Sequence, residues 1–590
     1  MAKPEYQKFL TGFKIKKFQK EIEPQEILLD KLSQEKEKEL GVSEKQLETP
    51  ISQKVLKSFW IAILIILFVL FGKTFQLQVM EGGSLSALAE GNKFLNLSLR
   101  AERGVIYDRN LKQLVFNKAS FDLICDGEVF LEDLSHQDLI FFESRISDFP
   151  NCEIKNNTVR KYPEGGAFSH LLGYVRPTGE KTGLEEYYDD FLEARAGQLR
   201  VKRDAKGNLI SKEIISFPEA GDNLVLWLDS GLQEKVAAAL KRQVINTGAE
   251  GGAVVALDPK TGGILALSSF PTFDNNLFSQ GISQEQWQNL RDDSRNPLFN
   301  RAVFGMGYPT GSTIKPLVGL AALEEGIITP EQQIYCPLEI CVQNPWDPQD
   351  QECYADWKYH GTSDLKRAIA ESVNTFFYQI GGGYEDFKGL GATKIKRWLE
   401  EFGWSTKTGV DLPKEGKGIL PVIDDNWTLG DTYHLSIGQG PFSITPIQVA
   451  AAFAAIANGG KLFQPQAVKK VINSEKELVK EMPPKVLRNI PADPENLEVI
   501  RQGMRQAVTS PQGSSYLLSS LPVSAAAKTG TAQASSREEI YHNWVTVFAP
   551  YEDPQIVLTV VIENVPGIQS AVLPAAREIL NWYFSAAVEN

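Results

Sequence analysis

A serine and a lysine three residues apart are the first side chains whose types and spacing could do chemistry. Ser312 and Lys315 come directly before Pro316 and an apolar run that predicts a helix over 316–326. Such a spacing brings both side chains to one helix face, where the free amides of the first turn can stabilise an oxyanion. A serine is a nucleophile once a base takes its proton, and burial makes a lysine such a base. The pair therefore indicates a nucleophile with its base.

The same spacing occurs twice more. Ser33 and Lys36 lie in a charged N-terminal segment, and Ser363 and Lys366 come just before a second helical stretch, predicted over 365–380. There the sequence predicts that Ser363 caps the helix and that Lys366 is solvated. The spacing alone therefore leaves Ser312 open between a nucleophile and a helix cap.

Ser372 and Asn374 form a second polar group, placed so that a turn or a helix start could aim both into one cleft. The other interpretation is a polar cap on a buried helix.

A third group is one of four Lys-Thr-Gly triplets, which begin at Lys181, Lys260, Lys407 and Lys528. The first three have turn or loop explanations, and only the last falls in a predicted strand. Alternation along that strand puts Lys528 and Gly530 on one face and Thr529 and Thr531 on the other, and glycine permits close approach of a ligand. Spacing does not decide which face is used.

The elements that must position these groups form an α+β domain. Two strand–turn–strand units, over 252–269 and 544–563, lie near the two ends of the last 350 residues or so. Helical stretches lie between them, and a final helix is predicted over 571–586. We therefore predict one antiparallel sheet that is built from both ends of the segment.

Upstream, residues 55–77 predict an uncleaved membrane anchor of 23 residues whose centre, residues 59–72, carries no charge. Twelve lysines precede residue 58, against four basic residues (Lys73, Lys93, Arg100, Arg103) between residues 73 and 103, so the N-terminus is expected in the cytoplasm. The predicted divisions are a tail over 1–54, the anchor, a strand-rich module over 78–230 and the α+β domain over 231–590.

Composition removes several classes of function. The formal net charge of -13 disfavours nucleic acid as a partner. Five histidines and five cysteines exclude a disulfide-dense miniprotein and disfavour a histidine-rich metallohydrolase. The motifs HExxH and GxSxG are absent from the sequence.

The order Ser312/Lys315, Ser372/Asn374, Lys528/Thr529/Gly530 resembles the three motifs of penicillin-binding proteins and serine β-lactamases. Segments 300–302, 436–440 and 548–551 are also similar to the transpeptidase domain of class B penicillin-binding proteins. Segments 103–110, 169–175 and 183–185 resemble their non-catalytic pedestal, or dimerisation, domain. Among the subtypes, elongation-type and division-type, the pedestal and residues 356–358 look most like the elongation-type protein, penicillin-binding protein 2.

The resemblance implies a peptidoglycan D,D-transpeptidase in which Ser312 attacks a stem peptide ending in D-Ala-D-Ala and which β-lactams acylate. Lys315 would take the serine proton, Ser372 would relay a proton to the leaving amine, and Asn374 would hold the acyl-side amide. The amides of Ser312 and Thr531 would form the oxyanion hole. The substrate carboxylate would be bound by Lys528, Thr529 and Thr531, beside Gly530.

The resemblance further implies a membrane partner, a polytopic glycosyltransferase of the SEDS (shape, elongation, division and sporulation) family, RodA-type. Rival functions are a D,D-carboxypeptidase or β-lactamase and a non-catalytic β-lactam-sensing scaffold. The anchor with its pedestal argues against the first pair, and the three intact motifs argue against the scaffold.

Three cysteines cluster between the first two motifs, at Cys336, Cys341 and Cys353, with Asp356 and His360 nearby. In an exported domain a cysteine pair favours a disulfide, although three cysteines and a histidine suit a tetrahedral Zn²⁺. Some elongation-type relatives carry a zinc site in this region, and Asp356 and His360 resemble part of that site. We expect a disulfide and no cofactor, with zinc as the alternative. Cys125 and Cys152 are either a second pair or two buried thiols.

Overall fold

The computed structural model describes residues 52–131, 133–204, 208–344, 349–535, 539–567 and 570–586. Nearly all of the predicted tail, including Ser33 and Lys36, lies outside these residues. The chain forms two compact units. The first comprises residues 1–97 and 200–213, and the second comprises residues 98–199 and 214–590. The domain boundaries predicted from the sequence remain predictions.

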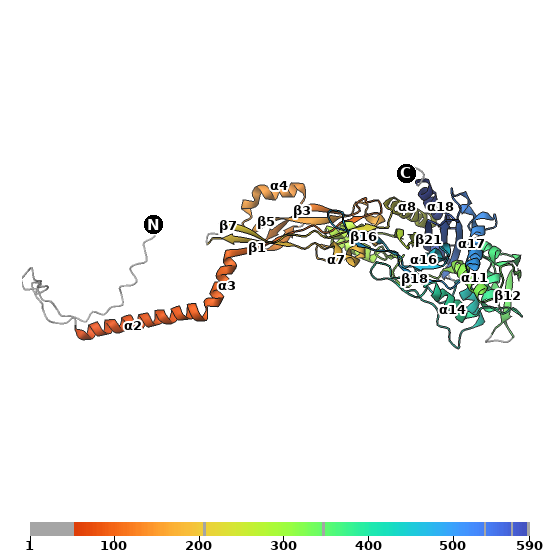
Figure 1. The fold of residues 1–590 in the computed structure, drawn as a ribbon, viewed down its shortest axis with the longest axis horizontal. Helices are drawn as coiled ribbons and strands as arrows, with labels where there is room; N and C mark the ends of the chain where they lie inside the picture. The colour runs from red at the N-terminus through yellow and green to blue at the C-terminus, as the bar shows by residue number, and fades with distance from the viewer. Residues whose placement is uncertain are drawn as a thin grey trace, which may run out of the picture. The chain divides into compact units, whose positions relative to one another are not determined.

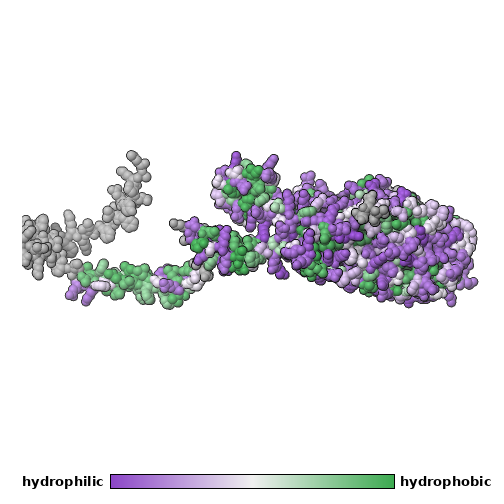
Figure 2. All heavy atoms as spheres, turned by 45° about the horizontal axis from the view of Figure 1, so that its top comes forward, coloured by the Kyte–Doolittle hydropathy of each residue, from purple (hydrophilic) through white to green (hydrophobic). Residues whose placement is uncertain are grey.

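The first unit contains the apolar helix α2 (Gln53–Phe75), which continues as a π-helical turn, η3 (Gln76–Met80). The Ser52 side chain caps α2 by accepting a hydrogen bond from the amide of Val55. Apolar side chains cover the surface of α2, as Figure 2 shows, and none of its residues is buried. Within the described residues, this helix is long and apolar enough to cross a membrane, by length and composition.

Short sheets make up the N-terminal part of the second unit, as the predicted strand-rich module requires. One of them has the order β4-β3-β5 and contains β3 (Phe116–Cys125), β4 (Glu128–Leu131) and β5 (Cys152–Lys161). A disulfide between Cys125 and Cys152 joins two residues that lie opposite each other in β3 and β5.

The rest of the second unit is built around a five-stranded antiparallel sheet with the order β10-β9-β21-β20-β19. Figure 1 labels β21, the central strand of this sheet. Its strands are β9 (Gly251–Leu257), β10 (Ile264–Phe270), β19 (Ala526–Ser535), β20 (Ile540–Ala549) and β21 (Ile556–Pro566). The first two come from one end of the segment and the last three from the other, which confirms the predicted assembly.

Helices cover both faces of this sheet. Helices α8 (Ser230–Thr247) and α18 (Leu573–Ala586) contact one another and strands of the sheet. Helix α16 (Pro446–Ala457), fully buried, contacts β9, β20 and β21 in a separate core that also includes α11 (Lys315–Glu324). Because both faces are covered, β9 is buried along its whole length.

The stretch predicted to be helical over 365–380 consists of two helices, and Ser372 and Asn374 lie at the turn and the helix start between them, as one of the two interpretations of this motif expected. Helix α12 (Leu365–Glu371) ends and α13 (Asn374–Gly382) begins on either side of Ser372, whose backbone is left-handed with φ 60°. The prediction that Ser363 caps this stretch was wrong. The Asp364 carboxylate, and not Ser363, caps α12 by accepting the hydrogen bond from the amide of Arg367. The break turns Ser372 out of the helical path.

Candidate active site

Ser312 lies in a short 3₁₀ turn, η6 (Gly311–Ile314), and Lys315 is the first residue of α11. A 3₁₀ turn has three residues per turn, so side chains three positions apart lie directly above one another. Ser312 is half-buried, whereas the Lys315 side chain is fully buried. The serine and the lysine therefore lie on one face at a helix start, as the sequence predicted.

The Lys315 amine points at the second motif. Its Nζ donates to the Asn374 Oδ1 at 2.7 Å and to the Ser372 carbonyl at 2.8 Å, and lies 3.4 Å from the Ser372 Oγ. It also lies 5.3 Å from the centre of the Phe377 ring. Burial lowers the pKa of Lys315 to about 7, against an opposing influence of the Asp356 charge. Near neutral pH this amine is therefore available as a base.

Lys528 approaches Ser372 from β19. Its Nζ donates to the Ser372 Oγ at 2.9 Å and to the Thr529 carbonyl at 2.8 Å. Burial, followed by repulsion from Lys315, holds the pKa of Lys528 well below its ordinary range. The Ser372 hydroxyl thus lies between two amines whose charges depend on each other and on any anion bound beside them.

Close backbone contacts hold β19 against η6. A side chain on Gly530 would come within 2.4 Å of the Thr310 carbonyl oxygen, and one on Gly311 within 2.5 Å of that of Thr531. Lys528 and Gly530 are buried, whereas Thr529 is half-buried and Thr531 is exposed, as strand alternation predicts. The structure therefore turns the lysine toward Ser372 and leaves both threonines accessible.

The loop at 438–440 lies beside the same turn. The amide of Gly311 donates to the Gly438 carbonyl at 2.9 Å, and the Gln439 side chain donates to the Thr531 carbonyl at 3.4 Å. The three motifs thus meet at one place, although they come from segments far apart in the sequence. Such a cluster can transfer a proton from a hydroxyl to an amine beside free backbone amides, which is the chemistry of acyl transfer.

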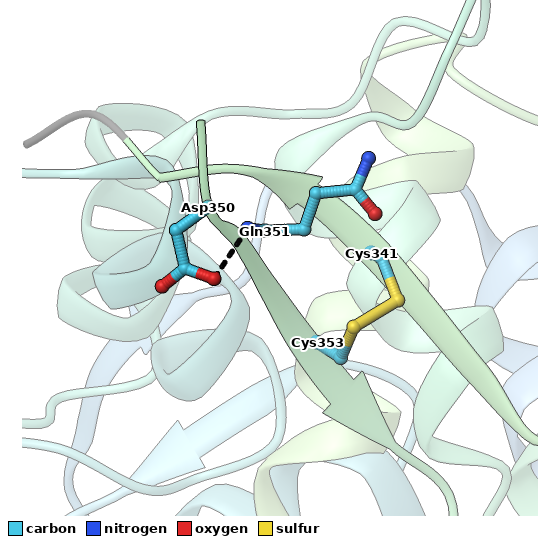
Figure 3. Close-up of a disulfide and its surroundings, with 4 residues drawn as sticks. All are labelled: Cys341, Asp350, Gln351 and Cys353. Atoms are coloured by element: carbon cyan, nitrogen blue, oxygen red, sulfur yellow. Dashed lines mark hydrogen bonds between the residues drawn. A yellow bond between two sulfur atoms is a disulfide. The ribbon is translucent and has the colours of Figure 1, made fainter. Parts of the chain in front are cut away.

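The cysteines between the first two motifs form one disulfide. Cys341 and Cys353 are bonded across β12 (Glu339–Gln343) and β13 (Gln351–Ala355), as Figure 3 shows, and Cys336 is a buried free thiol. Burial raises the pKa of that thiol to about 12, so it is protonated near neutral pH and is not a reactive thiolate.

The residues considered above as zinc ligands make other contacts in this structure, although the buried His360 Nε2 has no hydrogen-bond partner among the described residues. The disulfide occupies two of the three cysteine sulfurs that were considered as zinc ligands. The Asp356 carboxylate accepts hydrogen bonds from the amides of Trp357 and Thr375, and His360 Nδ1 lies 3.2 Å from Glu371. Sequence reasoning missed Glu371 and Thr375 as functional candidates, although they directly flank the second motif.

Two family models match the chain. Residues 252–581 match the penicillin binding protein transpeptidase domain, and residues 126–226 match the penicillin-binding protein dimerisation domain. The peptidoglycan D,D-transpeptidase MrdA of Haemophilus influenzae is 30% identical, covering 90% of this chain and 92% of its own. MrdA of Escherichia coli K12 is 29% identical, covering 88% of this chain and 92% of its own.

Solved structures are similar over most of the chain. A penicillin-binding protein 2 in complex with MreC from Helicobacter pylori has a TM-score of 0.71 and 27% identity, covering 84% of this chain and 99% of its own. A chain from a peptidoglycan synthase complex that coordinates polymerization and crosslinking has a TM-score of 0.69 and 26% identity, covering 90% of this chain and 98% of its own. These similarities extend beyond the active site to the N-terminal part of the chain.

Proposed function

Because this chain belongs to the penicillin-binding protein family of transpeptidases, we propose that Ser312, Lys315 and Ser372 carry out its acyl transfer. The chain is a serine-type peptidoglycan D,D-transpeptidase. The observation that supports the roles of Lys315 and Ser372 is the chain of contacts from the Lys315 amine through the Ser372 hydroxyl to the Lys528 amine, and Ser312 lies in η6, one turn before Lys315. It provides a buried base and a proton relay at a helix start.

In the first half-reaction, the Ser312 Oγ attacks the carbonyl carbon of the penultimate D-alanine while Lys315 takes the hydroxyl proton. The amides of Ser312 and Thr531 stabilise the oxyanion that forms. The peptide C–N bond then breaks, and the proton passes from Lys315 through Ser372 to the nitrogen of the leaving D-alanine. The product is an ester on Ser312 with free D-alanine.

In the second half-reaction, an amine of a neighbouring stem peptide attacks the ester carbonyl and loses a proton to Lys315. The bond between the carbonyl carbon and the Ser312 Oγ then breaks, and Lys315 returns the proton to that oxygen. Asn374 would hold the acyl-side amide during both steps. The substrate carboxylate would lie against Lys528, Thr529 and Thr531, while Gly530 allows the close approach of η6 that holds this strand in place. An arriving carboxylate favours the charged form of Lys528, whose pKa is lowered by burial and by Lys315.

Turnover with defined substrates tests this function. We expect the full chain, in lipid nanodiscs, to join a donor peptide ending in D-Ala-D-Ala to an acceptor amine, with one D-alanine released per cross-link. Penicillin should block both products. Release of D-alanine with only hydrolysed donor would instead indicate a carboxypeptidase. Neither product, and no acylation by penicillin, would indicate a scaffold.

The N-terminal segment supports a membrane anchor, and the structural similarities support a partner in the membrane. We propose that α2 holds the chain in the cell membrane with the N-terminus in the cytoplasm, because twelve lysines precede its apolar core. A polytopic RodA-type glycosyltransferase of the SEDS family is proposed as the partner. The similarity to a chain from a peptidoglycan synthase complex supports this choice.

Thiol counting tests the state of the five cysteines. We propose that the mature chain keeps both disulfides and no zinc, so alkylation of the denatured, non-reduced protein should modify Cys336 alone. Mass spectrometry of the alkylated protein measures this number, and elemental analysis of the same sample measures zinc. Stoichiometric zinc with three or more reactive thiols would contradict the proposal.

A further inference from the structure

One buried carboxylate fixes the residue that follows Asn374. The Asp356 Oδ2 accepts hydrogen bonds from the Thr375 amide at 2.8 Å and from the Thr375 Oγ1 at 3.0 Å. Helix α13 begins at Asn374, and the residue in its capping position, Val373, makes no side-chain cap. Asp356 therefore supplies, from a distant segment, an acceptor that the first turn of α13 needs.

The residue that precedes Ser372 is fixed from the same segment. The buried carboxylate of Glu371 lies 3.1 Å from the Lys358 Nζ and 3.2 Å from the His360 Nδ1. It also accepts a hydrogen bond from the Arg367 Nε at 2.7 Å. We call residues 356–360 the clamp loop, because they hold the residues on both sides of the second motif.

The disulfide fixes the hairpin from which the clamp loop departs. Cys341 and Cys353 lie opposite each other in the register of β12 and β13, as Figure 3 shows. The strand β13 ends at Ala355, and the amide of Asp356 then donates to the Leu338 carbonyl at 2.7 Å, just before β12. A covalent link at a paired position prevents the register from slipping, so it also fixes where the clamp loop begins.

The second motif needs such support. Ser372 has a left-handed backbone, which is unfavourable for a non-glycine residue, and its carbonyl and hydroxyl both face the Lys315 amine. A displacement of about 1 Å at such a contact lowers a rate by as much as about 100-fold.

We propose that the Cys341–Cys353 hairpin and the clamp loop are a positioning device, which holds Ser372 and Asn374 against the Lys315 amine for acyl transfer. Asp356 and Glu371 are its positioning residues, and the disulfide is its fixed end. This inference rests on the proposed function of Ser312, Lys315 and Ser372.

The first experiment compares the two disulfides in the full chain. Acylation by a fluorescent penicillin is measured as a second-order rate constant and as the final labelled fraction. We expect Cys341→Ser/Cys353→Ser to slow acylation about tenfold or more, with an unchanged final fraction. The matched control, Cys125→Ser/Cys152→Ser, opens the disulfide between β3 and β5 and should change the rate less than about twofold. Equal rates in the two variants would overturn the inference.

A second set of variants keeps both disulfides, so it tests the positioning role even if a double cysteine variant does not fold. Thr375→Val removes the hydroxyl that donates to Asp356, and Thr375→Ser retains it. We expect slower acylation in the valine variant and recovery of most of that loss in the serine variant. Equal loss in both would overturn the inference.

Asp356→Asn gives a readout that a merely structural role would not change. The charges that influence the Lys315 amine are those of Lys528 on β19 and Asp356 in the clamp loop, and the Asp356 charge favours protonation of that amine. We expect slower acylation together with an acid limb of the pH–rate profile moved to lower pH. An unmoved limb and an unchanged rate would overturn the inference, whereas absence of labelling in the wild-type chain would refute the proposed function.

Discussion

Replacing Ser312 with alanine is expected to abolish covalent labelling by a fluorescent penicillin and to lower transpeptidation by about four to six orders of magnitude. No neighbouring hydroxyl replaces it. Thr313 is buried and donates to the Thr310 carbonyl at 2.8 Å, and the Ser372 hydroxyl accepts a hydrogen bond from Lys528. Gel fluorescence of the labelled chain and mass spectrometry of the acyl adduct measure the loss.

The control for this variant is Ser363→Ala, which alters a serine with the same spacing to a lysine. Ser363 is buried, and its hydroxyl donates to the neighbouring Asp364 carbonyl at 3.1 Å, so it has a local structural role. We expect this variant to be labelled like the wild-type chain. Continued labelling of the Ser312→Ala variant at the wild-type rate would show that another residue is the nucleophile.

The sequence was sufficient to predict the pattern of the sheet and the three motifs. Alternating and continuous apolar runs predicted β9, β10, β20 and β21, because strands buried on both faces leave a strong hydrophobic signal. The helix start after Ser312 could be predicted from Pro316, which favours the first turn.

The second motif could not be predicted to the same depth. The stretch over 365–380 contains no glycine or proline, so its apolar pattern predicts a helical stretch, and whether a turn interrupts it at Ser372 depends on tertiary contacts. Asp356 and Glu371 provide these contacts on either side of the break. Local propensity carries no information about partners that lie in another segment.

The disulfide partner was equally hidden in the sequence. Cys336, Cys341 and Cys353 allow three pairings, and only the register of β12 against β13 places Cys341 opposite Cys353. That register is set by the folded hairpin. Cys336 lies instead in β11 (Ile334–Cys336), which pairs with β14 (Gly361–Ser363).

Acylation by penicillin is expected to lose about tenfold in rate for each pH unit below about 7 and to reach a plateau above it. The base must be uncharged, and burial lowers the pKa of Lys315 to about 7, so protonation removes the base as the pH falls through that value. The Lys315→Met variant, which keeps the volume but lacks the amine, should acylate about 10³–10⁴-fold more slowly at pH 8. Stopped-flow labelling across pH 5–9 measures both effects.

Lys366→Met is the matched control, because Lys366 has the same spacing from a serine and makes no side-chain contact with Ser372 or Asn374 among the described residues. Its rate and pH profile should equal those of the wild-type chain. A wild-type profile that stays flat from pH 5 to 9 would contradict the role of Lys315, because an uncharged amine must exist before Ser312 can lose its proton. A steep acid limb that persists in Lys315→Met would instead place the titrating base elsewhere, and Lys528, whose pKa burial also lowers, would then be the group that activates the serine.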